Sequence, residues 1–135
     1  MAELKGTQLF SVFDKIENVK HGLPSAAYTS NAFYELESKF IFAKYWTFLG
    51  FAHDLVQVGD IIPLEVAGQP LILVRSSKNK IRAFHNVCRH RNLKLVGEPR
   101  NYKSLITCPY HNWCYNLDGQ LRAAPFFGGQ KTELL

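Results

Sequence analysis

The sequence predicts a mainly β domain, an antiparallel sandwich or partly open barrel, preceded by helices at its amino terminus. Short runs of β-branched and aromatic residues recur at regular spacing after residue 44, and turn-forming residues separate them. Before residue 44, apolar residues recur with a helical period. The chain of 135 residues is long enough for one domain with a real hydrophobic core.

Two helices are expected before the strands. Apolar positions predict the first over residues 8–20, and Gly22 and Pro24 then end it. The second begins near Ser30 or Asn31, because either side chain can accept hydrogen bonds from the free N–H groups of the first turn. Its expected inner face consists of Phe33, Leu36, Phe40 and Ile41.

The expected strands are short and lie close together in the sequence. They cover residues 45–51, 60–66, 71–76, 80–87, 105–108, 112–117 and 120–123. Turn residues stand at 58–60, 67–69 and 77–79, and Asp118-Gly119 is a tight hairpin signal. Strands at this spacing are typical of antiparallel all-β folds.

Composition and charge limit the function classes. Hydrophobic residues make up 47% of the chain and charged residues 20%, and no apolar run approaches the roughly 18 residues of a membrane span. The first twenty residues contain no signal-peptide block, so a cytoplasmic location is expected, with no membrane partner. If two of the three cysteines are metal ligands, the third has no partner for a disulfide, which agrees with a cytoplasmic location.

The net charge of +5 is concentrated in one region. Its basic residues are Arg89, Arg91, Lys94, Arg100 and Lys103. They form either a solvated basic surface or a docking face for an acidic redox partner. No nucleic-acid-binding motif accompanies them, so no nucleic-acid partner is expected.

The chemistry-bearing motif is Cys88-Arg89-His90, followed after seventeen residues by Cys108-Pro109-Tyr110-His111. Each half offers one thiolate and one imidazole, whereas zinc sites usually group like ligands. The mixed pairs favour a Rieske 2Fe–2S cluster, in which two cysteines hold one iron and two histidines the other. Zinc is the alternative, and colour and an EPR signal on reduction distinguish the two.

The C-x-H and C-x-x-H pair resembles the Rieske family, and this resemblance implies the Rieske iron–sulfur fold with a small cluster-binding subdomain at about 84–117. The implied cofactor and metal ligands are Cys88, His90, Cys108 and His111. Cys114 is expected to be a packed thiol and not a ligand, because a small buried thiol on a strand is the default interpretation. The implied activity is one-electron transfer.

Two details place the resemblance within the low-potential branch of the family. Leu93 and Tyr110 occupy the positions where other Rieske proteins carry cysteines of a bracing disulfide, and Trp113 stands where they carry a serine. Residues 25–125 resemble the amino-terminal part of a ring-hydroxylating oxygenase α subunit. Asn92 and Asn112 replace glycines usual in that family, and Asn retains access to positive φ.

The resemblance implies a helical segment over 1–44, a Rieske domain over 45–127 and a tail over 128–135. A catalytic domain with mononuclear non-haem iron is expected outside this chain, which by itself has no catalytic residues. The implied partners are a ferredoxin or flavin reductase as electron donor, the oxygenase catalytic domain as acceptor, and a homotrimer in the full-length form. A stand-alone Rieske ferredoxin-type carrier is the alternative. Aromatic and quaternary-ammonium substrates are not distinguished.

Overall fold

The computed structural model describes residues 22–125, so the helix expected over residues 8–20 lies outside the described part. The chain divides into two compact units, with the boundary between Thr47 and Phe48. Each unit is described by itself. No helix between residues 22 and 125 is both long and apolar enough to cross a bilayer.

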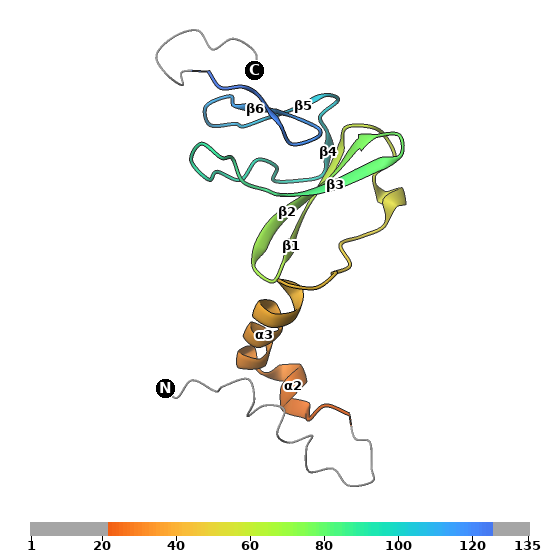
Figure 1. Ribbon diagram of the computed structural model, residues 1–135, viewed down its shortest axis with the longest axis vertical. Coiled ribbons are helices and arrows are strands. Elements are labelled where there is room, and N and C mark those ends of the chain that lie inside the picture. Colours follow the sequence, from red (N-terminus) through yellow and green to blue (C-terminus); the bar gives the residue numbers. More distant parts are fainter. Residues whose placement is uncertain (1–21, 126–135) are drawn as a thin grey trace. The chain divides into compact units, whose positions relative to one another are not determined.

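The first unit is helical, as expected (Figure 1). It contains α2 (Ser25–Thr29), which the sequence did not predict, α3 (Asn31–Glu37) and the π-helical turn η2 (Ser38–Phe42). The expected cap is confirmed, because the Ser30 hydroxyl accepts a hydrogen bond from the Phe33 N–H at 3.4 Å.

The expected inner face of this helix is only half right. Phe33 and Leu36 are partly buried, but Phe40 and Ile41 are 44% and 48% exposed. The cause is the change to π winding, which the Ala43 N–H to Ser38 carbonyl bond marks. A π turn contains more residues than an α turn, so the side chains that follow it rotate out of the α-helical stripe.

The second unit contains two antiparallel sheets, which confirms the mainly β prediction (Figure 1). The first sheet has the order β3-β2-β1-β4, and the second has the order β5-β6-β7. The strands are β1 (Asp60–Val66), β2 (Gln69–Ser77), β3 (Lys80–His85), β4 (Arg100–Asn101), β5 (Leu105–Thr107), β6 (Cys114–Asn116) and β7 (Leu121–Ala123). The sheets remain open and form no closed barrel.

Two strand predictions were wrong. Residues 45–51 form no strand, although their aromatic residues favour one. Phe48 and Phe51 instead pack edge to face, with ring centroids 5.1 Å apart, and no neighbouring strand of the described chain pairs with them. Strand β4 was not predicted, because only two residues pair with Asp60 and Ile61 of β1.

A short 3-10 helix, η3 (Ala52–Asp54), leads into β1. Arg75 of β2 holds this connection, since its guanidinium donates to the carbonyls of Ala52, at 2.8 Å, and of Leu55. Leu55 is buried. The connection is therefore attached to the first sheet by one cation and one apolar side chain.

The core of the second unit includes residues of both sheets and of the loops between them. It consists of Ile61, Ile72, Val74, Cys88, Leu95, Val96, Ile106, Cys108, Trp113, Tyr115, Leu117 and Ala124. Two of the predicted ligand residues, Cys88 and Cys108, therefore belong to the hydrophobic core itself.

Gly59 comes directly before β1 and lies against the end of β4 and the residues that follow it. Its φ is +92°, and a Cβ placed on it would lie 2.7 Å from the backbone nitrogen of Lys103. Its N–H donates to the Arg75 carbonyl, and its own carbonyl accepts from Tyr102. The backbone of Gly59 is therefore held by hydrogen bonds on both sides. The atom closest to an added Cβ is a backbone atom, which cannot move aside as the end of a flexible side chain can.

We expect Gly59→Ala to lower the free energy of unfolding by about 2–4 kcal/mol, because overpacking adds to the cost of a left-handed alanine. Gly68→Ala is the matched control, because Gly68 also has a positive φ, +76°, but nothing lies within 4 Å of its Cβ position. Urea denaturation measures both. Equal losses for the two variants would contradict the steric argument.

Candidate metal centre

The two loops that carry the predicted ligands, at 88–93 and 108–113, are called the ligand loops and are closed by the same pair of backbone hydrogen bonds. In the first loop the Cys88 N–H donates to the Leu93 carbonyl and the Asn92 N–H to the Cys88 carbonyl, both at 2.8 Å. In the second loop the corresponding bonds run from Cys108 to Trp113 at 2.8 Å and from Asn112 to Cys108 at 3.1 Å.

The asparagine in each loop makes this closure sterically accessible. Asn92 has a φ of 55° and Asn112 a φ of 57°, so both residues use the positive φ to which asparagine was expected to retain access. Asparagine enters this region at lower cost than other residues with a Cβ atom. The chain therefore reverses direction in the same way in both loops.

The two cysteines lie together inside the core. Cys88 is 1% exposed and Cys108 2%, both thiols are free, and Cys108 lies within hydrogen-bonding reach of Cys88. Burial by itself raises the pKa of the Cys88 thiol. Hydrogen bonds from Tyr115, the His90 backbone and Cys108 outweigh burial, and the pKa is lowered. The lowered pKa makes the thiolate of Cys88, the form that binds metal, easier to form.

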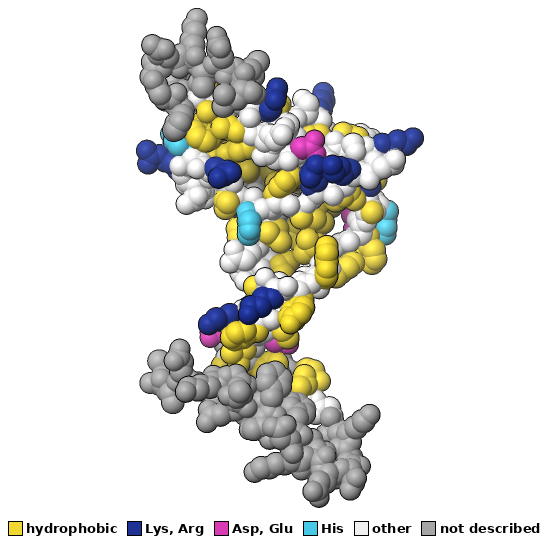
Figure 2. Space-filling model, viewed as in Figure 1, with side chains coloured by type: hydrophobic (Ala, Val, Ile, Leu, Met, Phe, Trp, Pro, Cys, Tyr) yellow, Lys and Arg dark blue, Asp and Glu magenta, His cyan; other side chains and the backbone are white. Residues whose placement is uncertain are grey.

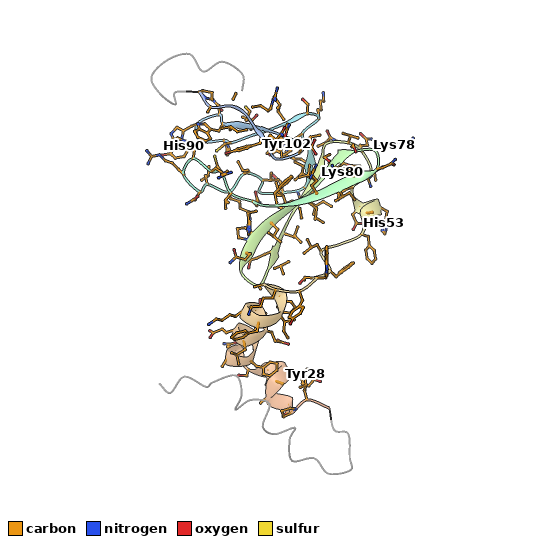
Figure 3. The ribbon with its side chains drawn as sticks, in the orientation of Figure 1. Tyr28, His53, Lys78, Lys80, His90 and Tyr102 are labelled. Carbon is orange, nitrogen blue, oxygen red and sulfur yellow. The ribbon has the colours of Figure 1, made fainter. Side chains whose placement is uncertain are left out.

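The two histidines form a second pair. The rings of His90, labelled in Figure 3, and His111 lie 4.7 Å apart between centroids, at 64° to each other. His90 also stacks on Trp113 at 4.7 Å, and Tyr110 contacts the His111 ring at 3.7 Å. Burial, together with the neighbouring His111 and Arg91, lowers the pKa of His90 and favours the neutral ring.

His111 has an orphaned nitrogen. Its Nδ1 is buried and has no hydrogen-bond partner among the described residues. Buried polar atoms in native proteins almost always have a partner. An iron at this nitrogen would supply the missing interaction, so the donor set fits a metal cofactor.

The four residues that the motif singled out thus lie in two pairs, one of thiols and one of imidazoles. No three or more His, Cys, Asp or Glu residues within 22–125 converge on a single metal position. A two-and-two arrangement is the donor set that a Rieske 2Fe–2S cluster requires.

Tyr115 of β6 is a site residue that sequence reasoning missed. Its hydroxyl lies 3.3 Å from the Cys88 sulfur and accepts a hydrogen bond from the Arg89 N–H at 3.1 Å. Burial, followed by the hydrogen bond to Cys88, raises the pKa of Tyr115 to about 12. The hydroxyl therefore keeps its proton and can donate a hydrogen bond to the sulfur.

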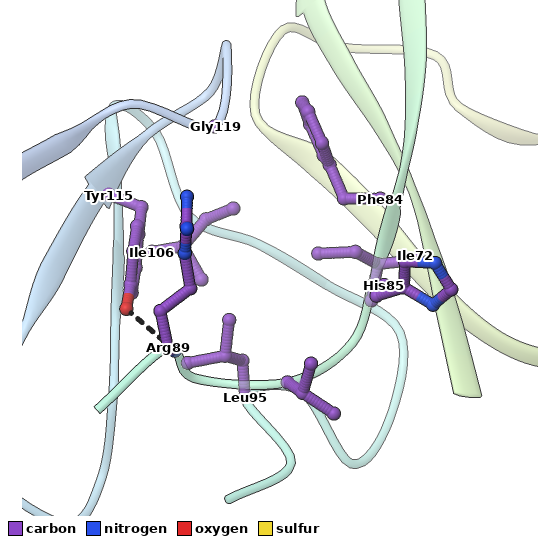
Figure 4. A pocket seen from close by; sticks show the side chains of 9 residues that line it. Ile72, Phe84, His85, Arg89, Leu95, Ile106, Tyr115 and Gly119 are labelled. Carbon is purple, nitrogen blue, oxygen red and sulfur yellow. Dashed lines mark hydrogen bonds between the residues drawn. The ribbon is translucent and has the colours of Figure 1, made fainter. Parts of the chain in front are cut away.

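A cavity of about 370 Å³ lies beside Tyr115 (Figure 4). Its walls are mostly apolar, and the Arg89 side chain extends along one of them beside the Tyr115 ring. The lining residues are Ile72, Phe84, His85, Val87, Arg89, Leu95, Ile106, Tyr115 and Gly119. Cys88 and Tyr115 are both buried, and burial strengthens the hydrogen bond between them.

The Asn86 side chain connects the two ends of the first loop by hydrogen bonds. It is fully buried, donates from its side chain to the Val96 carbonyl at 2.7 Å, and accepts from the N–H groups of Leu95 and Val96. Its own N–H donates to the Pro70 carbonyl of β2. The loop is therefore tied to the first sheet at both of its ends.

Three neighbouring residues have different environments. Cys114 is only partly buried, and its thiol contacts Thr107 at 3.4 Å and donates to the Asn112 carbonyl at 3.2 Å. Trp113 is buried against His90, in line with a packing role. Tyr110 is 59% exposed, and its ring lies against the His111 ring.

The family of the chain follows from a match over most of this unit. The Rieske [2Fe-2S] domain matches residues 45–132, which include both ligand loops. The chain belongs to this family. Its cofactor is accordingly a Rieske 2Fe–2S cluster.

Relatives of this Rieske domain are oxygenase subunits. The glycine betaine monooxygenase oxygenase subunit of Chromohalobacter salexigens is 36% identical over 110 residues, which are 82% of this chain and 24% of that protein. A quaternary ammonium Rieske monooxygenase structure, described for carnitine oxidation and inter-subunit electron transfer, has a TM-score of 0.68 at 39% identity, covering 76% of this chain and 28% of that one.

A third relative acts on a different substrate class. The structure of naphthalene 1,2-dioxygenase from Rhodococcus sp. has a TM-score of 0.69 at 28% identity, covering 82% of this chain and 26% of that one. The chain thus spans about a quarter of the length of the proteins it matches, which corresponds to their Rieske part.

The loop geometry generates a test of its own. Because Asn112 has a φ of 57°, we expect Asn112→Val to lower the free energy of unfolding by about 1–3 kcal/mol, since a β-branched residue is a genuine outlier there. Asn112→Gly, which removes the Cβ constraint, is the matched control and should stay within about 1 kcal/mol of wild type. Urea denaturation of the cluster-loaded proteins measures both, and a Gly variant as unstable as the Val variant would contradict the φ argument.

Proposed function

We propose that the chain transfers single electrons through a cluster held by Cys88, His90, Cys108 and His111. The observation that carries this proposal is the division of the four side chains into a buried thiol pair and an imidazole pair. Cys88 and Cys108 would hold one iron, and His90 and His111 the other. When bound, the cluster accepts and releases one electron.

The residues of the chain itself have separable roles in this proposal. The buried cysteines exclude water from the sulfur side, and Tyr115 donates a hydrogen bond toward Cys88. His111 would bind through its buried Nδ1, which leaves the other ring nitrogen free to hold or release a proton. Trp113 fixes the ring plane of His90 by stacking on it.

The whole protein, in this proposal, is a terminal oxygenase. Its Rieske domain takes electrons from a ferredoxin or flavin reductase and passes them to a mononuclear non-haem iron in a catalytic domain outside this chain. The similarity to an enzyme described for inter-subunit electron transfer supports transfer between subunits, as in a homotrimer. A cytoplasmic location is part of the proposal, supported by three free thiols.

The substrate belongs to the proposal too. Glycine betaine and carnitine monooxygenase subunits match this chain at 36% and 40% identity, which supports a quaternary-ammonium substrate over an aromatic ring. Full-length protein given glycine betaine, carnitine and naphthalene in turn, with oxygen and a reduced electron-donor protein, tests the choice. Oxidation of naphthalene without oxidation of either ammonium compound would reverse it.

Cys88→Ser should abolish the Rieske EPR signal and the two irons per chain, because the cluster loses a thiolate and the two loops lose their crosslink. Cys114→Ser is the matched control, since its partly buried thiol already bonds to Thr107 and to the Asn112 carbonyl, and it should keep iron and sulfide at the wild-type level. A full signal in Cys88→Ser, or loss of iron in Cys114→Ser alone, would contradict the ligand assignment.

Tyr115→Phe should lower the midpoint potential by tens of millivolts, because one hydrogen bond of about 1 kcal/mol to a ligand sulfur is lost and one electron is transferred. Reducing the cluster adds negative charge, which the hydroxyl donor stabilises. EPR-monitored redox titration measures the potential. Tyr102→Phe is the control, since the Tyr102 ring contacts Arg100 at 5.0 Å and its hydroxyl makes no hydrogen bond to another described residue. An unchanged midpoint potential in Tyr115→Phe would contradict the role of the Tyr115 hydroxyl in raising it.

A further inference from the structure

The cavity beside Tyr115 is not needed for the electron transfer proposed above, and we call it the Arg89 cavity. It lies between the two sheets of the second unit, since Ile72 and Phe84 belong to β2 and β3, and Ile106 and Tyr115 to β5 and β6. Its volume is about 370 Å³. An apolar cavity of about 150 Å³ can already bind benzene, so this one has room for one ring with a polar substituent.

The walls of the Arg89 cavity are held in place by the core. Ile72 and Ile106 are 1% and 2% exposed, and Tyr115 is 5% exposed. The Phe84 ring lies directly over the backbone of Gly119, because a Cβ placed on that glycine would lie 2.6 Å from the ring. Core packing therefore leaves apolar surface uncovered on walls that cannot easily collapse, and an apolar ligand would gain free energy by covering it.

The cation of this cavity is Arg89. Figure 4 shows its side chain pointing into the space between the Tyr115 ring and Phe84. The bond from its backbone N–H to the Tyr115 hydroxyl, at 3.1 Å, fixes the point from which the side chain starts. Its guanidinium forms no ion pair or hydrogen bond with another residue of 22–125. A free guanidinium can bind a carboxylate through two parallel hydrogen bonds.

No acidic side chain competes for this cation within the described part of the chain. The lining of the Arg89 cavity contains neither Asp nor Glu. Asp118, the residue before Gly119, is paired with Arg82 instead. Figure 2 shows many dark blue side chains and few magenta ones on the visible face of the second unit. The charge of the cavity therefore favours an anionic ligand.

We propose that the Arg89 cavity binds a small monocarboxylate with an apolar body. The carboxylate pairs with the Arg89 guanidinium, and the apolar body lies between Phe84 and Tyr115. The two aromatic walls favour a flat ring, since aromatic rings stack or pack edge to face.

Binding at this cavity is coupled to the oxidation state of the cluster. Arg89 stands between the ligands Cys88 and His90 in the sequence, and its charge stabilises the negative charge that reduction adds. A carboxylate paired with Arg89 cancels part of this effect. The ligand should therefore bind the oxidised protein more tightly than the reduced protein and, by linkage, lower the midpoint potential. This coupling rests on the proposed function, whereas the cavity itself does not.

Four probes test the chemistry of the ligand by isothermal titration calorimetry on the oxidised, cluster-loaded chain. Benzoate and hexanoate have a carboxylate and an apolar body, benzyl alcohol lacks the charge, and acetate lacks the body. Benzoate should bind about tenfold or more tightly than benzyl alcohol or acetate, because a hydrogen bond to a charged group contributes about 1.5–3 kcal/mol. Hexanoate binding more tightly than benzoate would support the site and assign it to aliphatic carboxylates.

Three variants locate the binding. Arg89→Gln should raise the Kd of benzoate about tenfold or more and leave that of benzyl alcohol unchanged. Arg100→Gln is the matched control, because Arg100 is also exposed and carries the same charge but does not line the cavity, and it should keep the wild-type Kd. Val87→Phe places a larger side chain on a half-buried wall and should weaken both ligands. The Arg89→Gln comparison decides by itself if Val87→Phe does not fold.

The coupling has a separate readout. In an EPR-monitored redox titration, saturating benzoate should lower the midpoint potential of the wild type and leave that of Arg89→Gln unchanged. A merely structural role of Arg89 would not make the potential respond to benzoate. An unchanged wild-type potential at saturation would overturn the coupling.

The remaining failures are distinguishable. Equal benzoate Kd values for wild type and Arg89→Gln would overturn the carboxylate site, and so would acetate binding as tight as that of benzoate. Equal weakening in Arg89→Gln and Arg100→Gln would assign the effect to net charge and overturn it too. Absence of a Rieske EPR signal from the reduced chain would overturn the proposed function, while the calorimetric Kd values would still decide the site.

Discussion

The site depends on one repeated backbone arrangement, the two hydrogen bonds that close each ligand loop. They join the Cys88 N–H to the Leu93 carbonyl and the Asn92 N–H to the Cys88 carbonyl, and they recur around Cys108. The backbone N–H and carbonyl groups of both cysteines already have hydrogen-bond partners in these loops. The two cysteines can therefore be buried in the core without leaving these backbone groups unpaired. The histidines stand two and three residues further on, and their rings meet at 4.7 Å although the loops differ in this spacing.

This arrangement separates two environments within a few residues. The thiols lie among apolar side chains at 1% and 2% exposure, while the imidazoles are half-buried, His90 against Trp113 and His111 against Tyr110. A buried sulfur side and a more accessible imidazole side suit a relay, because electrons must reach the cofactor while water is kept from its core. The Tyr115 hydroxyl adds a hydrogen bond to Cys88, and the burial of both residues strengthens it.

The fold around the two loops positions them through hydrogen bonds and close packing. Asn86 ties the first loop to β2 and to residues 95–96, and Gly59 lies closely against the end of β4 and the residues that follow it. Neither residue carries a charge or a ligand. Asn86 holds the two ends of the first loop together before any metal is bound, which lowers the conformational cost of assembling the donor set.

The sequence by itself determined the features that depend on local chemistry. The spacing of Cys88, His90, Cys108 and His111 specified the cofactor class, because ligand type and loop length follow directly from the chain. Tight turns and positive φ at Asn92 and Asn112 were predictable for the same reason. Tertiary structure alone decided the absence of a strand at 45–51, the two-residue β4 and the contact of the Tyr115 hydroxyl with Cys88. Each of these depends on a partner or a packing surface far away in the sequence, and propensity carries no information about which distant groups will meet.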